Sequence, residues 1–169
     1  MAQLGDDLQK LHEQIAHGAL PRAYGSIVGY MAQLRSHFAA RDGDRAVSAL
    51  YQGCFDMTYF ALHPAALKSR GLKLAIVFDY EAFGFEVWLA ARNRAVQRQY
   101  WQLLQDNGWT AHRLVEPAPG IDAIVETDVA GASAMNEPEA LTASIEESAQ
   151  VLLAEVLAFL DAHDPREQR

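Results

Sequence analysis

Cysteine is almost absent from the sequence, since Cys54 is the only one among 169 residues. A disulfide framework needs pairs of cysteines and a thiolate zinc site needs several, so both are excluded within this chain. Basic residues are also scarce, with 14 Lys and Arg against 22 Asp and Glu, which gives a net charge of -8. This charge repels a phosphate backbone and argues against nucleic acid as a partner.

Long apolar runs and catalytic motifs are missing as well. No apolar stretch reaches membrane-spanning length, and the segment MAQLGDDLQKLHEQ is too polar for a signal peptide. We therefore expect a cytoplasmic protein without a membrane partner. The sequence has no glycine-rich phosphate loop, nucleophile elbow or CxxC motif, and its six scattered histidines lack metal-ligand spacing. We expect no cofactor and no metal, and whether the protein is an enzyme stays open.

The residues that are present indicate an ordinary globular chain. Half are hydrophobic and 21% are charged. We expect one domain, residues 1–165, and a frayed tail, residues 166–169. Apolar residues at helical spacing predict four substantial helices, over residues 4–17, 21–42, 93–107 and 138–164. The apolar stripe of the first helix consists of Leu4, Leu8, Leu11 and Ile15.

Between these helices the apolar pattern changes to a period of two. Residues 51–62, 72–79 and 83–90 each alternate in this way, and shorter stretches at 111–116 and 122–130 do the same. Short turns between neighbouring strands favour antiparallel pairing. The sequence therefore predicts an α+β fold, with a mostly antiparallel sheet of about five strands packed against long N- and C-terminal helices.

The register of the central hairpin follows from burial. Leu74 and Ile76 on the first strand and Val87 on the second belong to the apolar sets that must face one core. This alignment pairs Val77 with Glu86, Ala75 with Trp88 and Lys73 with Ala90. Glu86 and Trp88 then point away from the core, and Lys73 lies diagonal to the indole.

The same reasoning assigns other polar residues to this second face. In residues 51–62 we take the odd-numbered side chains as buried, which leaves the even-numbered ones on the second face. If Ile121, Ala123 and Val125 point inward, the intervening carboxylates join it. The expected second face therefore carries Gln52, Asp56, Thr58, Lys73, Glu86, Trp88, Asp122, Glu126 and Asp128.

A mixed aromatic and charged face without a catalytic motif favours a binding module over an enzyme. Our preferred hypothesis is a protein that binds a small ligand or a protein, and that forms a homodimer through this face or the neighbouring helix ends. Arg92, Arg94 and Arg98 also surround a helix N-terminus, which attracts anions, so an anion or nucleotide site is an alternative. The candidate ligand-binding residues are Asp56, Lys73, Glu86, Trp88, Arg92, Arg94 and Arg98.

A metal-dependent hydrolase is the other alternative. Asp56, Glu86 and a carboxylate from residues 122–128 would supply the oxygen ligands that hard cations prefer. Asp79 and Glu86 loosely resemble the acidic pair of restriction-type nucleases. However, no lysine stands two residues after Glu86, so the usual nuclease signature is absent. We favour a solvated acidic sheet face over a metal site as the explanation of these carboxylates, since acidic residues are mostly exposed.

Three segments carry a resemblance to a known family. DMTYF, LKLAIVF and FEVWLA, the last followed by an Arg- and Asn-rich helix start, resemble the central block of a small bacterial family known only as a domain of unknown function. The resemblance spans residues 20–130. It implies a cytosolic bacterial protein and brings no activity or catalytic residues. The order of strands and helices is also similar to accessory domains beside restriction-type nucleases, an analogy of fold that implies no function.

Overall fold

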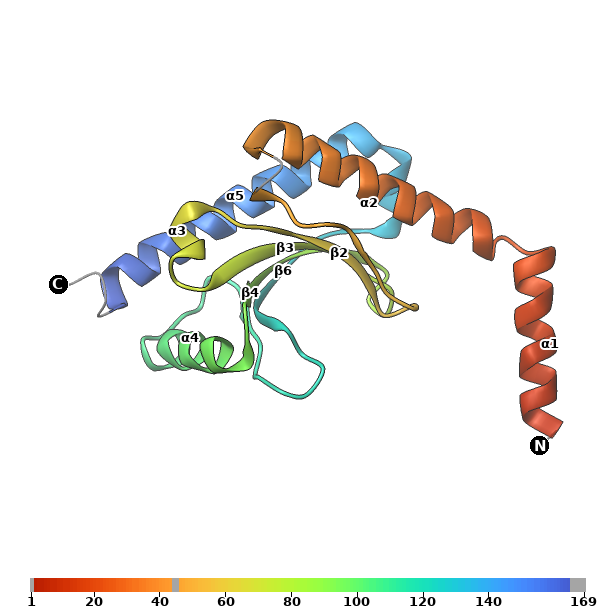
Figure 1. Ribbon diagram of the computed structural model, residues 1–169, viewed down its shortest axis with the longest axis horizontal. Helices are drawn as coiled ribbons and strands as arrows, with labels where there is room; N and C mark the ends of the chain where they lie inside the picture. Colours follow the sequence, from red (N-terminus) through yellow and green to blue (C-terminus); the bar gives the residue numbers. More distant parts are fainter. Residues whose placement is uncertain (1, 44–45, 165–169) are drawn as a thin grey trace.

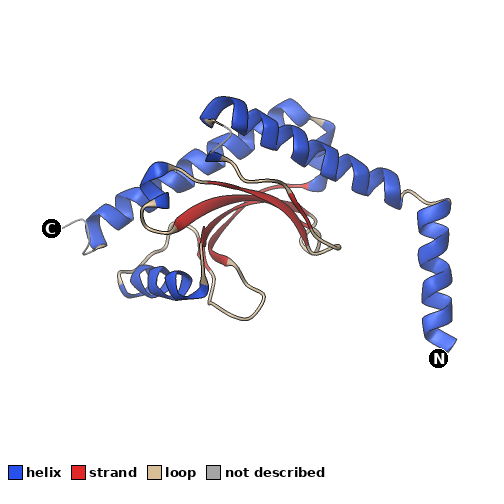
Figure 2. Cartoon of the chain, viewed as in Figure 1, coloured by secondary structure: helices blue, strands red, loops and turns tan. Residues whose placement is uncertain are grey.

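The computed structural model describes residues 2–43 and 46–164, and the expected tail at 166–169 lies outside them. Helices and strands alternate along the chain as an α+β fold, which confirms the predicted class (Figures 1 and 2). The helices are α1 (Ala2–Ala16), α2 (Leu20–Asp42), α3 (Ala65–Lys68), α4 (Arg94–Asp106), the 3-10 helix η2 (Ala132–Asn136) and α5 (Pro138–His163). The strands are β1 (Tyr51–Gln52), β2 (Met57–Leu62), β3 (Leu72–Asp79), β4 (Gly84–Ala91), β5 (Arg113–Leu114) and β6 (Ala123–Gly131).

The six strands form one antiparallel sheet in the order β1-β2-β3-β4-β6-β5. The sheet is curved, and α2 and α5 lie across the face that is uppermost in Figure 1. We call this the upper face and the opposite one the lower face. Helix α4 and the loop before β6 lie on the lower side, at the end of the sheet where β4 leads into α4.

The main core lies between the upper face and the two long helices. Alternate strand residues such as Ile76 and Val87 are fully buried there, together with Met31 of α2 and Leu152 of α5. Burying a side chain of this size contributes about 1.5–3 kcal/mol relative to leaving it exposed. This burial fixes which face of each strand points upward and therefore which residues are left for the lower face.

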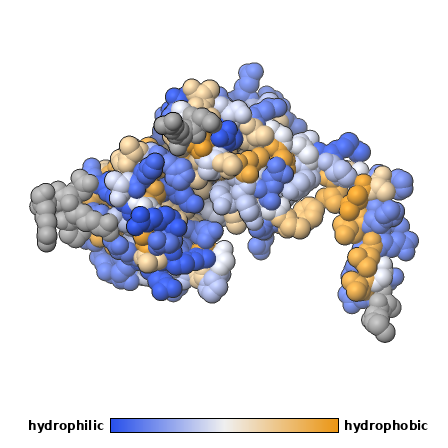
Figure 3. Space-filling model, viewed as in Figure 1, coloured by the Kyte–Doolittle hydropathy of each residue, from blue (hydrophilic) through white to orange (hydrophobic). Residues whose placement is uncertain are grey.

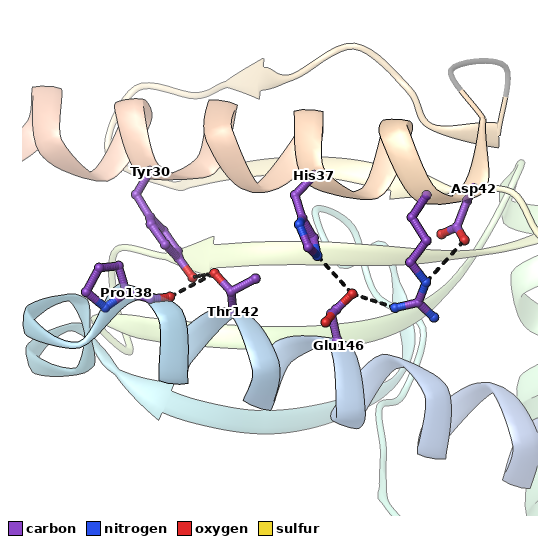
Figure 4. Close-up of polar contacts among 7 residues, drawn as sticks. Tyr30, His37, Asp42, Pro138, Thr142 and Glu146 are labelled. Carbon is purple, nitrogen blue, oxygen red and sulfur yellow. Dashed lines mark hydrogen bonds and ion pairs between the residues drawn. The ribbon is translucent and has the colours of Figure 1, made fainter.

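A line of polar contacts joins α2 to α5 above the core (Figure 4). The hydroxyl groups of Tyr30 and Thr142 lie 3.0 Å apart. Further along, Glu146 lies 2.9 Å from His37 Nε2 and accepts a hydrogen bond of 2.5 Å from Arg41. Arg41 also lies 3.7 Å from Asp42. These contacts fix the lengthwise position of one helix against the other, which apolar packing alone defines poorly.

The structure confirms the register predicted for the central hairpin. Val77 pairs with Glu86, Ala75 with Trp88 and Lys73 with Ala90. The turn between the strands is closed by Asp79, whose carboxylate accepts hydrogen bonds from the backbone N–H groups of residues 81 and 82. Small Ala75 opposite the indole leaves the space that Trp88 fills.

The face assignment predicted for residues 51–62 is wrong. A turn at residues 53–56 divides this segment into two paired strands, and Tyr51 pairs with Tyr59. Phe60 lies in the main core, whereas Met57 and Tyr59 border the lower-face cluster. Even-numbered Gln52 and Thr58 therefore lie on the upper face. The burial of Phe60 and Leu62 opposite Ile76 and Leu74 decides this phase.

Helix α1 lies apart from the sheet, as Figure 1 shows. The chain turns sharply between α1 and α2 near Gly18. The backbone N–H of Gly18 donates to the carbonyls of Glu13 and Gln14 at the end of α1. The stripe Leu4, Leu8, Leu11 and Ile15 is between 46% and 65% exposed. The apolar stripe of α2, in contrast, is buried in the core.

Candidate functional site on the lower sheet face

Glu86 and Trp88 lie on the lower face, as predicted, but they are not open to solvent. Their exposed fractions are 5% and 7%. Trp88 forms a small second cluster with Ala75, Val77 and Ala123, separate from the main core. The indole Nε1 donates a hydrogen bond of 2.5 Å to Oε2 of Glu86. The hydrogen bond thus pairs the indole N–H with a carboxylate oxygen, and the indole is part of the packed interior of the lower face.

Glu86 belongs to a group of acidic side chains at the middle of the sheet. It pairs across the strands with Asp128, and Trp88 pairs with Glu126. Arg113 on β5 forms an ion pair with Glu126. The prediction that Glu126 and Asp128 share the face of Glu86 is therefore confirmed. Ala123 also lies on this face, contrary to prediction, because β6 is irregular between the partners of Leu89 and Ala90.

Burial controls the acidity of this group. Desolvation raises the pKa of Glu86 above its ordinary value, and the nearby Asp79 and Asp128 raise it further. The hydrogen bond from Trp88 and the charge of Arg113 oppose this rise. Desolvation likewise raises the pKa of Glu126, with Arg113 opposing. Carboxylates in such surroundings resist losing their protons and are less available to a cation.

The geometry does not support the metal-dependent alternative. Within residues 2–43 and 46–164, no three His, Cys, Asp or Glu side chains are grouped so as to hold a metal ion. Asp56 lies in the exposed turn before β2, where its backbone carbonyl accepts a hydrogen bond from Tyr80. The charge of Asp56 acts on Tyr80, and it is not among the groups that shift the pKa of Glu86.

Three adjoining hollows lie where the lower face meets α4. The first is small, about 20 Å³, and lies against Trp88, Tyr59 and Lys73. The second, about 200 Å³, shares Lys73 and Asp122 with it and adds Arg92, Arg94 and Gln97. The third, about 300 Å³, shares Arg94 and is completed by Arg98 and the segment Pro117–Pro119. The structure thus brings together five of the seven predicted residues, namely Lys73, Trp88, Arg92, Arg94 and Arg98.

Arg94 is already bound within the chain. Its guanidinium donates to Gln97 at 2.9 Å and to the backbone carbonyl of Ile121, and it lies 3.4 Å from Asp122. Gln97 is buried and donates to the carbonyls of Ile121 and Ala123. These bonds attach the loop before β6 to α4. Arg94 therefore builds the wall of the hollows, and Asp122 offsets its charge.

Lys73, Arg92 and Arg98 remain available. Their side chains form no hydrogen bond or ion pair with any other described residue. Arg92 crosses Gly71, which has a φ of +73°. The backbone carbonyl of Gly71 accepts a hydrogen bond from the backbone N–H of Arg92. A Cβ at Gly71 would lie 3.0 Å from Arg92 Nε, so glycine leaves room for the arginine to cross it. Three cationic side chains that no carboxylate neutralises create a local positive potential, which attracts an anion even though the whole protein is acidic.

His63, which directly follows β2, lies close enough to Lys73 of β3 and Lys68 of α3 for their charges to act on it. Burial lowers its pKa, and the positive charges of Lys73 and Lys68 lower it further. Sequence analysis did not select this histidine because it considered the six histidines as scattered residues without metal-ligand spacing. His63 follows Leu62, the partner of Leu74, and together with Lys68 it lines a hollow between α2, α3 and α5.

Helix α4 begins at this site. Asn93 is its N-cap, as predicted, and its side chain accepts a hydrogen bond of 2.9 Å from the Val96 backbone N–H. Capping fixes the direction of the first turn, from which Arg94 and Arg98 project one helical turn apart. Arg113 does not join this basic group, because it is paired with Glu126.

A larger hollow that the sequence did not predict lies on the upper side, between α2, α3 and α5. Its volume is about 550 Å³, and its walls include Phe38, Leu62 and Leu153. Its central charged groups neutralise each other, because Arg41 is bound to Glu146. This hollow offers apolar surface, and its polar lining also includes His63 and Lys68.

Comparison with known proteins identifies the family and nothing more specific. A family model described as "Domain of unknown function (DUF7000)" matches residues 4–160. The chain belongs to this family. No curated protein and no solved structure matches it. The match agrees with the resemblance to an uncharacterised family found in the sequence. Of the helices in residues 2–43 and 46–164, none has both the length and the apolar character that crossing a membrane requires.

Proposed function

We propose that the protein binds a small anionic molecule, such as a carboxylate or a phosphate ester, at the end of the lower face. Its anionic group would lie in the hollow lined by Lys73 and Arg92. The rest of the molecule would extend past Arg94 toward Arg98 and Pro117–Pro119. The observation that carries this proposal is the convergence of Lys73, Arg92 and Arg98, without internal partners, on adjoining hollows of a chain with net charge -8.

The chemistry of the hollows supports an anion over a cation or an apolar ligand. A guanidinium and an ammonium group both donate charge-assisted hydrogen bonds to carboxylate or phosphate oxygens. The N-terminus of α4 adds the positive end of the helix dipole. Asp122 faces the same hollow, but its charge is offset by Arg94. The hollow at Trp88 has about 20 Å³, which suits a water molecule or a single small group.

The cellular setting is part of the same proposal. Cys54 is exposed and free. An exposed thiol is compatible with a reducing compartment, which supports the cytoplasmic location expected from the sequence. The ligand would be a metabolite present there, and the binding itself requires no cofactor or metal.

A thermal-shift titration of the full chain tests the proposal, with inorganic phosphate, citrate and AMP as probes. A probe at one hundred times its dissociation constant should stabilise the fold by about 2.7 kcal/mol. The double variant Lys73→Ala/Arg92→Ala should lose this stabilisation. Lys10→Ala/Arg22→Ala removes the same charge from exposed positions far along the chain and should keep it. Absence of any shift, or an equal shift in both variants, would contradict the proposal.

A further inference from the structure

The exposed stripe of α1 contributes four of the exposed large hydrophobic residues of the described chain. Leu4, Leu8, Leu11 and Ile15 are all among its exposed large hydrophobic residues. In Figure 3 the hydrophobic residues of α1 gather along the side of the helix that is turned toward the body. A helix of 15 residues is marginally stable in water without packing, so α1 needs a surface that covers this stripe.

The spacing of the stripe identifies the kind of surface that fits. The four residues are separated by four, three and four positions, which is the a/d pattern of a two-heptad coiled-coil seam. Leu8 and Ile15 then occupy a positions, and Leu4 and Leu11 occupy d positions. Such a seam packs best against another seam with the same spacing, and a second copy of the chain provides one. A two-fold dimer places each stripe against the other.

The polar side of α1 argues against a membrane surface. It carries Asp6, Asp7 and Glu13 against the single Lys10. Helices that lie on membranes are usually rich in Lys and Arg, which are attracted to anionic lipids. An acidic helix is repelled by such a surface, so a protein surface is the better match.

Two aromatic loop tips extend the apolar surface beyond α1. Phe55 and Phe83 have φ values of 60° and 53° and are 53% and 54% exposed. A left-handed backbone costs about 1–2 kcal/mol at a residue of this kind, and nothing within the chain covers their rings fully. Phe55 packs on Tyr24, in the first turns of α2 next to α1, with ring centroids 5.6 Å apart. Phe55 thus lies beside the start of α2, next to α1, while Phe83 packs on Phe78 of β3.

We propose that α1 is a dimerisation arm whose stripe packs against the α1 stripe of a second copy, with Phe55 and Phe83 at the margin of the interface. The proposal places the dimer contact on α1, whereas the sequence analysis expected it on the face of Glu86 and Trp88 or at the neighbouring helix ends. Trp88 is buried within its own chain and is not available to a second copy. The proposal is independent of ligand binding at the lower face.

Sedimentation velocity on the full chain, across a dilution series, tests the arm. The wild type should show a species of twice the 18.7 kDa chain mass that dissociates on dilution. Leu8→Glu/Leu11→Glu places charge in the seam and should be monomeric at every concentration. Gln3→Glu/Gln9→Glu adds the same charge on the polar side of α1 and should still dimerise. Tryptophan fluorescence checks that the body stays folded, since α1 lies apart from the three tryptophans.

Cross-linking gives a second measurement that does not depend on a charged variant. In a Cys54→Ser background, Leu8→Cys/Leu11→Cys should form a covalent dimer on oxidation in either direction of helix pairing. Gln3→Cys/Gln9→Cys should not. A wild type that is monomeric throughout, or a dimer that survives Leu8→Glu/Leu11→Glu, overturns the proposal. If that monomer sediments with phosphatidylcholine vesicles, the stripe binds membranes and not a second copy.

Discussion

Glu86 is a side chain whose charge depends on its burial. Because burial raises its pKa above 4.5, the folded protein keeps this proton at pH values where the unfolded chain has lost it. Unfolding then releases a proton, so stability falls as pH rises from about 4.5 through the folded pKa and is constant above it. The buried carboxylate is therefore a cost at neutral pH.

Glu86→Gln should reduce this fall in stability. The amide oxygen can still accept the hydrogen bond from Trp88, but the side chain no longer ionises. The free energy of unfolding, measured by denaturant titration between pH 4.5 and neutral, should decline less with pH than in the wild type. Glu81→Gln, at an exposed turn position, is the matched control and should leave the pH profile unchanged. Identical profiles for Glu86→Gln and the wild type would contradict the role given to burial.

His63 provides a measure of the charge of Lys73, one residue of the proposed site, although His63 itself lines the hollow between α2, α3 and α5. Its pKa is lowered first by burial and then by Lys73 and Lys68. Lys73→Ala removes one of these charges, so the pKa of His63 should rise toward 6.5 in an NMR titration. Lys10→Ala should leave it where it is. A His63 pKa that does not respond to Lys73→Ala would remove the electrostatic support for the site.

Sequence reasoning placed some residues of the site and missed others for a physical reason. Lys73, Glu86 and Trp88 were placed correctly because most of the Leu, Ile and Phe residues of their hairpin lie on one side. His63 and Gln97 were missed. The position of His63 depends on the phase of a strand whose two faces are both apolar, and Gln97 becomes informative only once the loop before β6 is seen to bond to it.

At the scale of elements, α4 depends on its cap. Asn93→Ala removes the side-chain acceptor for the Val96 N–H and should cost about 1 kcal/mol of stability, measured by chemical denaturation. Because the first turn of α4 also carries Arg94 and Arg98, the variant should bind anionic probes more weakly as well. Asn93→Asp keeps an acceptor and should retain most of the stability. Equal stability of Asn93→Ala and the wild type would show that the cap does not hold this helix end.

The contact of α2 with α5 depends on Glu146. The hydrogen bond with His37 is the main cause that lowers the pKa of Glu146, and Arg41 lowers it further. A lowered carboxyl pKa gives stability that is present above 4.5 and is lost as pH falls through the folded pKa. Glu146→Gln should therefore cost about 1–2 kcal/mol at neutral pH.

The neighbouring Glu147 is exposed and serves as the control, so Glu147→Gln should be close to neutral in the same denaturation experiment. The difference between the two variants should shrink below pH 4.5, where Glu146 becomes protonated. A constant difference at all pH values would mean that packing, and not the charge of Glu146, joins the two helices.

Most elements followed from the sequence, while two strands show where sequence patterns fail. In residues 51–62 large apolar side chains stand at odd positions, such as Met57 and Tyr59, and at even positions, such as Phe60 and Leu62. The sequence therefore does not show which set faces the core. Only the pairing with β3 decides between them. In β6, the irregularity near Ile124 reverses the alternation, so Ala123 and Val125 face opposite sides. The period of apolar residues in the sequence does not reveal a β-bulge, which is one extra residue in one strand of a pair.

At the scale of the whole molecule, the α+β class and the antiparallel sheet were predictable from alternating segments and short turns. The position of α1 was not. Its apolar stripe looks in sequence like that of any core-facing helix, and the stripe of α2 is indeed buried. The difference lies in the sharp angle at Gly18, which directs α1 away from the sheet. Helical periodicity shows that a stripe needs covering but not which surface covers it.

The central claim is that an anion binds at the cationic end of the lower face. Amide chemical-shift mapping of the full chain during a titration with AMP tests it most directly. The account predicts saturable shifts concentrated at Lys73, Arg92 and the first turn of α4. No saturable shifts, or shifts confined to the hollow between α2, α3 and α5, would contradict it.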